Sequence, residues 1–242
     1  MKIVVGKDVE EMGALAAELT AGKLRKAIAE KGEARLILST GASQFTLFNH
    51  LVAKDLPWDK VIMFHLDEYV GLPESHGASF RKYLKERFIN IVRPKHAFLV
   101  DGEADVKTVI DELTREIRKA PVDLALIGIG ENAHIAFNDP PADFDTKEAY
   151  ITVELDEACK RQQVREGWFP SVDDVPKQAI TMSVHQILQC NAIISCVPYK
   201  VKANAIKMTL ENDITNMIPA TVLKKHDDYT LFLDNDSASL VN

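Results

Sequence analysis

Short apolar runs alternate along the chain with longer stretches in which apolar residues recur every three or four positions. Six of the runs are nearly continuous in apolar residues and are predicted strands: 2–5, 34–39, 60–66, 122–128, 191–197 and 229–234. A seventh run, 149–155, fits the same class less well. Nearly continuous apolar strands are typical of parallel sheets that helices cover on both faces.

The stretches between these strands have helical spacing. From Asp8 onward, apolar residues at positions 9, 12, 15, 16 and 19 form one stripe, and Asp8 with Glu11 predicts a capping box at its start. The stretches 79–92, 105–119 and 200–210 are also amphipathic. This alternation predicts a doubly wound, mostly parallel α/β sheet of Rossmann-like type. Because no repeat or Gly/Ser-rich linker interrupts it, residues 1–242 are predicted to form one domain.

Composition narrows the class of protein. The 242 residues are 46% hydrophobic and 27% charged, as in ordinary globular proteins. No apolar run approaches the roughly 20 residues of a membrane span. The N-terminal run turns polar too soon for a secretory signal, so the sequence predicts a cytoplasmic protein without a membrane partner. A homo-oligomer is compatible with the sequence, which carries no signal that decides it.

Charge and cysteine spacing exclude further classes. A net charge of −7 argues against nucleic-acid binding, although a local cluster of N–H groups and cations could still bind a small anion. Cys159, Cys190 and Cys196 lack metal-type spacing and are odd in number. They are therefore predicted to be reduced, small apolar residues rather than disulfide partners or zinc ligands.

Polar residues follow four of the predicted strands, in the groups 39–44, 67–68, 131–139 and 199–202. In open α/β sheets, ligands bind outside the carboxyl ends of the strands. The four groups are therefore predicted to surround one site.

The first group has the chemistry of a phosphate-binding turn. Gly41 permits a tight turn before Ala42, while Ser39, Thr40 and Ser43 offer hydroxyls beside free backbone N–H groups. The spacing is neither that of a P-loop nor that of a dinucleotide fold. The alternative is an ordinary polar turn with Ser43 as a helix N-cap.

The second and third groups contain candidates for proton transfer. A partly desolvated Asp67 would have a raised pKa and could accept a proton, unless Asp67 and Glu68 only cap the next segment or face solvent. His134 suits proton transfer near neutral pH, and Asn138 or Asp139 could orient it. A metal site is the rival interpretation, but the spacing of these residues is a weak ligand pattern. A purely structural histidine is the other alternative.

The remaining candidates are cations. Arg161 and Arg165 lie on a predicted helix, and Lys200 and Lys202 follow the strand at 191–197. Each could neutralise a phosphate, or could belong to a solvated charged surface.

Taken together, STGASQ, LDEYVGLP and GIGENAHIAFNDP resemble the motifs of the glucosamine-6-phosphate deaminase (isomerase) family, which is related to the 6-phosphogluconolactonases. The resemblance continues through FPSVDDVPKQAITMSV, KANAIKMTLEN and IPATVLKKH, and so covers almost the whole chain. The stretches DEYVGLP and AHIAFN are more similar to the deaminase branch than to the lactonase branch.

The resemblance implies that an amino-sugar 6-phosphate is converted to fructose 6-phosphate and ammonia without a metal or another cofactor. It implies that His134 opens the sugar ring, with Asn132 and Asp139 behind it, and that Asp67 moves the proton from C2 to C1. The residues implied to surround the phosphate are Ser39, Thr40, Gly41, Ala42, Ser43 and Lys202.

The chain departs from the family pattern at several of these positions. Asn132 stands where the family often has Asp, Ala133 where it has Gly, and Asp139 where it has Glu. Gly167 aligns with a phosphate-binding Arg of the family, and Arg165 or Arg161 is predicted to substitute for it. The sugar epimer therefore stays open.

Two alternative functions follow. One is a lactonase-like hydrolase in which His134 activates water, and the other is a non-catalytic sugar-phosphate sensor. A lid is also predicted between residues 140 and 180, which begin with a loop-like stretch.

Overall fold

The fold is built on a parallel sheet, as the sequence predicts. The computed structural model describes residues 1–165 and 167–241. In this part of the chain, seven strands form the main sheet in the order β1-β10-β9-β6-β2-β3-β5, and every neighbouring pair is parallel. The strands are β1 (Lys2–Gly6), β2 (Ala34–Leu38), β3 (Val61–His65), β5 (His96–Phe98), β6 (Leu124–Leu126), β9 (Ile193–Val197) and β10 (Tyr229–Asp234).

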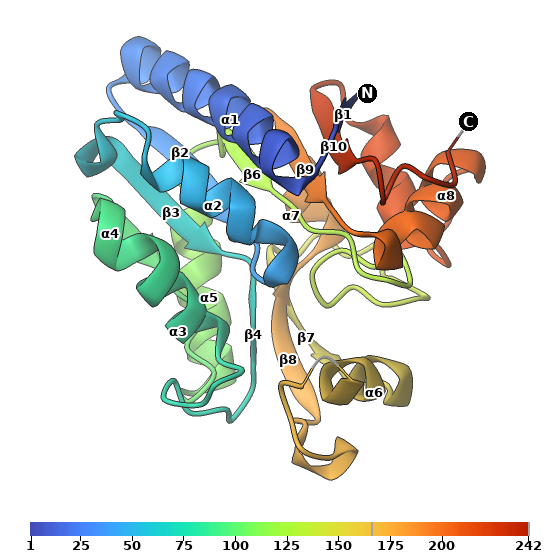
Figure 1. The fold of residues 1–242 in the computed structure, drawn as a ribbon. Helices are drawn as coiled ribbons and strands as arrows, with labels where there is room; N and C mark the ends of the chain where they lie inside the picture. The colour runs from blue at the N-terminus through green and yellow to red at the C-terminus, as the bar shows by residue number, and fades with distance from the viewer. Residues whose placement is uncertain (166, 242) are drawn as a thin grey trace.

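Helices cover both faces of this sheet (Figure 1). On one face lie α1 (Val9–Lys31), α2 (Phe45–Val52), α3 (Phe80–Leu84), the π-helical η3 (Lys85–Ile89) and α4 (Asn90–Val92). On the other face lie α5 (Val106–Ile117), α7 (Val184–Leu188) and α8 (Ala203–Glu211). Short 3-10 turns complete the connections: η1 (Ala42–Gln44), η2 (Trp58–Lys60), η4 (Val172–Asp174), η5 (Lys200–Lys202) and η6 (Pro219–Lys225).

The central strands are apolar on both sides because both sides are buried. In β2, Leu36 and Leu38 pack with the core beneath α1 and α2, whereas Ile37 packs with the core beneath α5 and α7. Successive side chains of a strand point to opposite faces, so a strand between two helical layers needs a continuous apolar run. The predicted doubly wound α/β class is confirmed.

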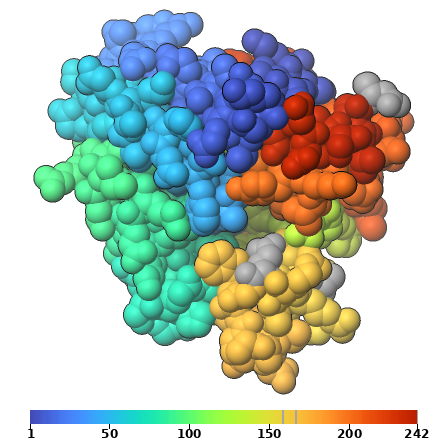
Figure 2. All heavy atoms as spheres, in the orientation of Figure 1, coloured from blue at the N-terminus to red at the C-terminus, as the bar shows by residue number. Residues whose placement is uncertain are grey.

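A second, smaller sheet was not predicted. β4 (Asp67–Tyr69), β8 (Gln178–Met182) and β7 (Tyr150–Glu154) pair antiparallel in that order. The run at 149–155 is therefore a strand, but it lies outside the main sheet. With α6 (Glu157–Arg165), this sheet forms the lower part of the view in Figure 1. Figure 2 shows α6 and the loop after it, in yellow, as a lobe below the blue and orange segments.

The predicted capping box is present only in part. The Asp8 side chain accepts a hydrogen bond from the backbone N–H of Glu11, as an N-cap should. The Glu11 carboxylate accepts from the N–H of Lys7 rather than from that of Asp8. Among the described residues, no helix is both long and apolar enough to cross a membrane.

Candidate active site

The four polar groups that follow strands meet at one cavity of about 370 Å³. They follow β9, β6, β2 and β3, which are neighbours at the centre of the sheet. The chain crosses from one half of the sheet to the other between β2 and β6, where Ser39 N–H donates to the Leu126 carbonyl at 3.0 Å. Such a switch point is where an open α/β sheet has room for a ligand.

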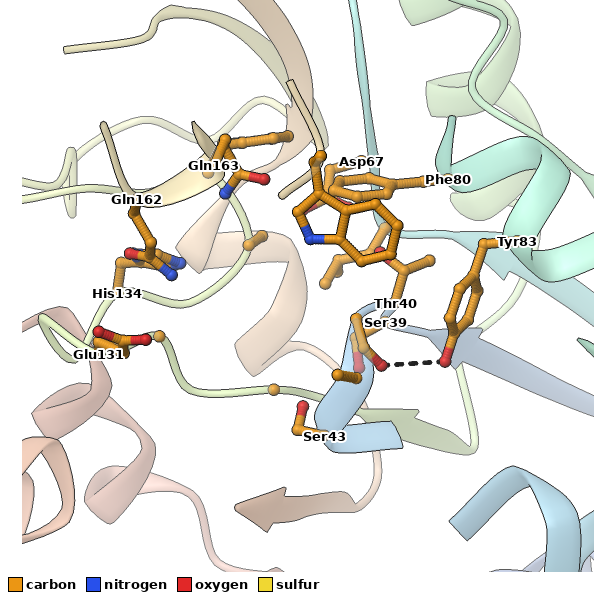
Figure 3. Close-up of a pocket in the computed structure, with 18 of the residues that line it drawn as sticks. Ser39, Thr40, Ser43, Asp67, Phe80, Tyr83, Glu131, His134, Gln162 and Gln163 are labelled. Atoms are coloured by element: carbon orange, nitrogen blue, oxygen red, sulfur yellow. Dashed lines mark hydrogen bonds between the residues drawn. The ribbon is translucent and has the colours of Figure 1, made fainter. Parts of the chain in front are cut away.

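The cavity is lined by Ser39 to Ser43 of the predicted phosphate turn, and by Asp67, His134 and Lys202 among the predicted catalytic and cationic residues. Figure 3 shows Asp67 and His134 reaching the cavity from different segments of the chain, with Ser39, Thr40 and Ser43 on a third.

The turn after β2 presents hydroxyls rather than capping a helix. Gly41 has φ 101° and ψ 165°, a conformation that only glycine adopts readily. Gln44 rather than Ser43 is the N-cap residue of α2, and Ser43 Oγ accepts a hydrogen bond from the Gln44 side chain at 3.0 Å. Ser39 Oγ is buried and has no hydrogen-bond partner among the described residues. A buried hydroxyl that faces a cavity is a ready contact for a ligand oxygen.

Asp67 and Glu68 are adjacent in β4 but have different environments. Asp67 lines the cavity with only 5% of its surface exposed. Burial, helped by the neighbouring charge of Glu68, raises the pKa of Asp67 to about 8. A carboxylate with so high a pKa is a much stronger base than an ordinary aspartate.

Glu68 instead organises the wall of the cavity. Its carboxylate accepts hydrogen bonds from Ser79 Oγ and from the backbone N–H of Arg81, both at 2.9 Å. The guanidinium of Arg81 lies 3.5 Å away and also binds the Leu72 carbonyl. These contacts fix the loop that places residues 77–80 along the cavity.

His134 is held from two sides. Its Nδ1 lies 2.9 Å from Asp139 Oδ1, although the contact is bent away from ideal hydrogen-bond geometry. Its backbone N–H donates to Asn132 Oδ1, and the Asn132 amide donates to Asp139 at 3.0 Å. Burial opposes the charge on Asp139, but its contacts with His134, Asn132 and Cys159 outweigh this and lower the pKa of Asp139.

The segment around His134 is a tight loop, not a helix. Asn138 therefore does not share a face with His134, and its amide binds the carbonyls of Ile135 and Met182 instead. A Cβ on Gly130 would lie 2.3 Å from the imidazole of His134, so only glycine leaves room for the ring. Ala133 has φ 64°, which explains why glycine would suit this position.

The cations divide between the cavity and the surface. Lys202 lines the cavity, as predicted. Arg165 makes an ion pair with Glu131 at 2.5 Å, and Glu131 itself lines the cavity. Arg161 is 73% exposed and lies 4.0 Å from Glu157 within its own helix, so it faces away from the site.

Sequence reasoning missed a group of lining residues with apolar rings or amides. They are Phe80, Tyr83, Gln162, Gln163 and Trp168. They come from α3, from α6 and from the loop after it, and no spacing in the sequence marks them as site residues. The Tyr83 hydroxyl donates a hydrogen bond to the Gly41 carbonyl at 3.0 Å, which Figure 3 shows as a dashed line.

No group of three or more His, Cys, Asp or Glu side chains that could hold a metal ion occurs within residues 1–165 and 167–241. Cys159, Cys190 and Cys196 are all buried. His65 is fully buried in β3.

Comparison with known proteins identifies relatives over the full chain. A family model described as glucosamine-6-phosphate isomerases/6-phosphogluconolactonase matches residues 7–232. A glucosamine-6-phosphate deaminase of Lactobacillus delbrueckii subsp. bulgaricus is 35% identical, with 100% of both chains covered. One from Thermoanaerobacter sp. (strain X514) is 34% identical over 100% of this chain and 95% of the relative.

Solved structures agree with these relatives. A monomeric glucosamine-6-phosphate deaminase has a TM-score of 0.89 and 31% identity, covering 99% of this chain and 100% of that one. A 6-phosphogluconolactonase from Thermotoga maritima has a TM-score of 0.79 at 18% identity, covering 96% and 99%. At that identity the likeness concerns the fold alone.

Proposed function

Because the chain belongs to the family of glucosamine-6-phosphate isomerases and 6-phosphogluconolactonases, we propose that it converts glucosamine 6-phosphate to fructose 6-phosphate and ammonia. The observation that carries this proposal is the joint presence, in one cavity, of a buried carboxylic acid at Asp67 and a histidine backed by a carboxylate at His134. Relatives named as deaminases, at 34% and 35% identity, support the same reaction.

The phosphate group binds at the turn after β2. Ser39, Thr40 and Ser43 provide hydroxyls, the turn provides backbone N–H groups, and Lys202 provides a positive charge. The unpartnered Ser39 Oγ supports this assignment, because it is buried at the cavity and can donate to a phosphate oxygen. The phosphate thereby fixes the sugar at one end of the cavity.

His134 opens the pyranose ring. Its Nε2, on the side of the ring away from Asp139, moves a proton between the 1-hydroxyl and the ring oxygen. Asp139 fixes the orientation of the imidazole and stabilises its positive charge during the transfer. Asn132 holds Asp139 in place by donating to it, so an amide at this position serves the same arrangement.

Asp67 then performs the isomerisation. Its carboxylate removes the proton from C2 of the open-chain sugar, and the resulting acid returns a proton to C1. The C1 oxygen gains a proton in this step and the amine loses one, so the product is an imine at C2 with a hydroxyl on C1. Addition of water to C2 and departure of the amine as ammonia leave the ketone of fructose 6-phosphate. An acid with a pKa of about 8 can both accept and return a proton near neutral pH.

This chemistry favours a deaminase over a lactonase. Hydrolysis of a lactone needs activated water but no base at C2, so it gives no reason to place a buried aspartic acid such as Asp67 in the cavity. The lactonase structures share the fold at less than 20% identity and add nothing on the reaction.

The experiment that tests the proposal supplies the purified protein with glucosamine 6-phosphate, galactosamine 6-phosphate and 6-phosphogluconolactone in parallel. We expect ammonia from an amino sugar phosphate and no accelerated hydrolysis of the lactone. Lactone hydrolysis without ammonia would replace this proposal with the lactonase alternative. Binding of the phosphosugars without turnover, seen as a raised melting temperature, would support the sensor alternative.

A further inference from the structure

Tyr199 has a backbone conformation that its side chain disfavours. It lies between β9 and η5, with φ 78° and ψ 144°. For a bulky residue this combination is strained, since only glycine adopts such angles readily. Strain of this kind persists only when the surroundings impose it, and it is concentrated at functional sites.

The surroundings impose it through Asp234, the last residue of β10. Both carboxylate oxygens of Asp234 accept a hydrogen bond from the backbone N–H of Tyr199, at 3.0 Å and 3.2 Å. Asp234 is only 4% exposed and also accepts from the N–H of Ser237 at 2.7 Å. The carboxylate is therefore fixed in position, and it fixes the backbone of Tyr199 in turn.

The phenol of Tyr199 lies near the turn after β2, because in addition to burial it contributes to the raised pKa of Tyr83, whose hydroxyl donates to the Gly41 carbonyl. Tyr199 lines the cavity together with Lys202 and the turn from Ser39 to Ser43. That turn is tied to β9 by the Gln44 side chain, which donates to the Cys196 carbonyl at 3.4 Å. Tyr199 is 37% exposed, so packing in the core does not explain why a tyrosine occupies a position that suits glycine.

We propose that Tyr199 is a phosphate-binding residue whose hydroxyl donates a hydrogen bond to the 6-phosphate of the substrate. The inference rests on the proposed function and assigns a further contact at the same site. Of the cations predicted to bind the phosphate, Arg165 is paired with Glu131, Arg161 is exposed, and Lys202 lines the cavity. A phenol donor adds a second contact for the phosphate.

Two substitutions distinguish the contribution of the Tyr199 hydroxyl to substrate binding from that of the strained backbone. Tyr199→Phe removes only the hydroxyl, and we expect KM for glucosamine 6-phosphate to rise about tenfold with kcat within about twofold, as for the loss of a hydrogen bond to a charged group. Tyr199→Gly also relieves the strain. We expect its KM to rise at least as much, while its melting temperature equals or exceeds that of the parent protein.

Arg93→Gly is the matched control for the backbone. Arg93 also has a positive φ, 52°, and is exposed after α4, outside the cavity. Its replacement should relieve strain in the same way without changing KM. A rise in KM for Tyr199→Gly but not for Arg93→Gly would exclude a general effect of relieved strain.

Inhibition by inorganic phosphate identifies the group that Tyr199 contacts. If the hydroxyl binds the phosphate, the inhibition constant for phosphate rises in Tyr199→Phe in parallel with KM. A higher KM with unchanged phosphate inhibition would overturn the assignment, and so would unchanged values of both.

If the parent protein releases no ammonia, the thermal shift produced by phosphate or by glucosamine 6-phosphate still tests Tyr199. A shift that is smaller in Tyr199→Phe would support this inference although the proposed function had failed, and an equal shift would overturn it.

Discussion

The Nδ1 atom of His134 lies 2.9 Å from Oδ1 of Asp139, and the Asn132 amide lies against the same carboxylate. We expect Asp139→Asn to lower kcat for ammonia release by about 10- to 100-fold, because the imidazole loses the charge that orients it. Asp139→Glu keeps the charge and should retain more activity than the amide variant. Equal activities of the amide variant and the parent protein would remove Asp139 from the mechanism.

The raised pKa of Asp67 predicts the pH dependence of the reaction. The base must be ionised before it can remove the C2 proton, and its pKa is about 8. We therefore expect kcat/KM to rise with pH and to level off above about 8, since this ratio reports the free enzyme. Rates of ammonia release between pH 6 and 9.5, at low substrate, measure this dependence. A profile that is flat across this range would show that another group is the base.

The ionised form of Asp67, which catalysis needs, should lower the free energy of unfolding of the protein. Its pKa is about 8 in the folded protein and 3.8 in the ordinary case, so between these values the folded state holds a proton that the unfolded state has released. Stability then falls as pH rises from about 4 to 8.

Asp67→Asn removes this penalty and should abolish turnover. We expect its melting temperature to exceed that of the parent by an amount that grows from pH 4 to pH 8, at about 2–4 °C for each kcal/mol relieved. Thermal unfolding at several pH values compares the two proteins, and glucosamine 6-phosphate should still stabilise the variant. A difference in melting temperature that does not depend on pH would contradict the raised pKa.

The ion pair between Arg165 and Glu131 connects α6 to the loop that carries His134. If the segment between 140 and 180 includes a lid, as the sequence predicts, this pair helps to hold it closed. An exposed pair contributes about 0.2–1 kcal/mol, so Arg165→Gln should raise KM by up to about fivefold. Glu131→Gln should have a similar effect, and the double variant should be no worse than either. Arg161→Gln, on the exposed side of α6, is the control and should behave as the parent.

Lys202 lines the cavity and is proposed to provide the positive charge that binds the phosphate. Lys202→Ala should raise KM by about tenfold or more and leave kcat largely unchanged, because the lost contact binds substrate and transition state alike. Lys200→Ala is the matched control, since Lys200 lies two residues away and is exposed. Equal kinetics of the two variants would make Lys202 a surface residue.

The sequence predicted the main sheet because buried parallel strands leave a strong signal. Runs such as 34–39 and 229–234 are apolar throughout, and the rule that ligands bind at strand ends then brought Ser39, Asp67, His134 and Lys202 to one site. β4 and β5 were not predicted, because β4 consists of the polar run DEY and β5 is only partly buried, whereas the equally short β6 lies within the apolar run 122–128.

The features of the site that were not predicted from the sequence depend on tertiary contacts. Trp168 and Gln163 reach the cavity because the segment around α6 lies beside it, and nothing in their local sequence indicates this. The different environments of Asp67 and Glu68 arise from Ser79 and Arg81, more than ten residues away. The strain at Tyr199 depends on Asp234, which is 35 residues away in the chain.

The most direct test of the central claim is the stoichiometry of products from glucosamine 6-phosphate, with Asp67→Asn run in parallel. We predict that the parent protein releases ammonia and fructose 6-phosphate in equal amounts, while the variant binds the substrate and releases neither. Fructose 6-phosphate and ammonia formed at the parental rate by the variant, or no ammonia from the parent protein, would contradict the account.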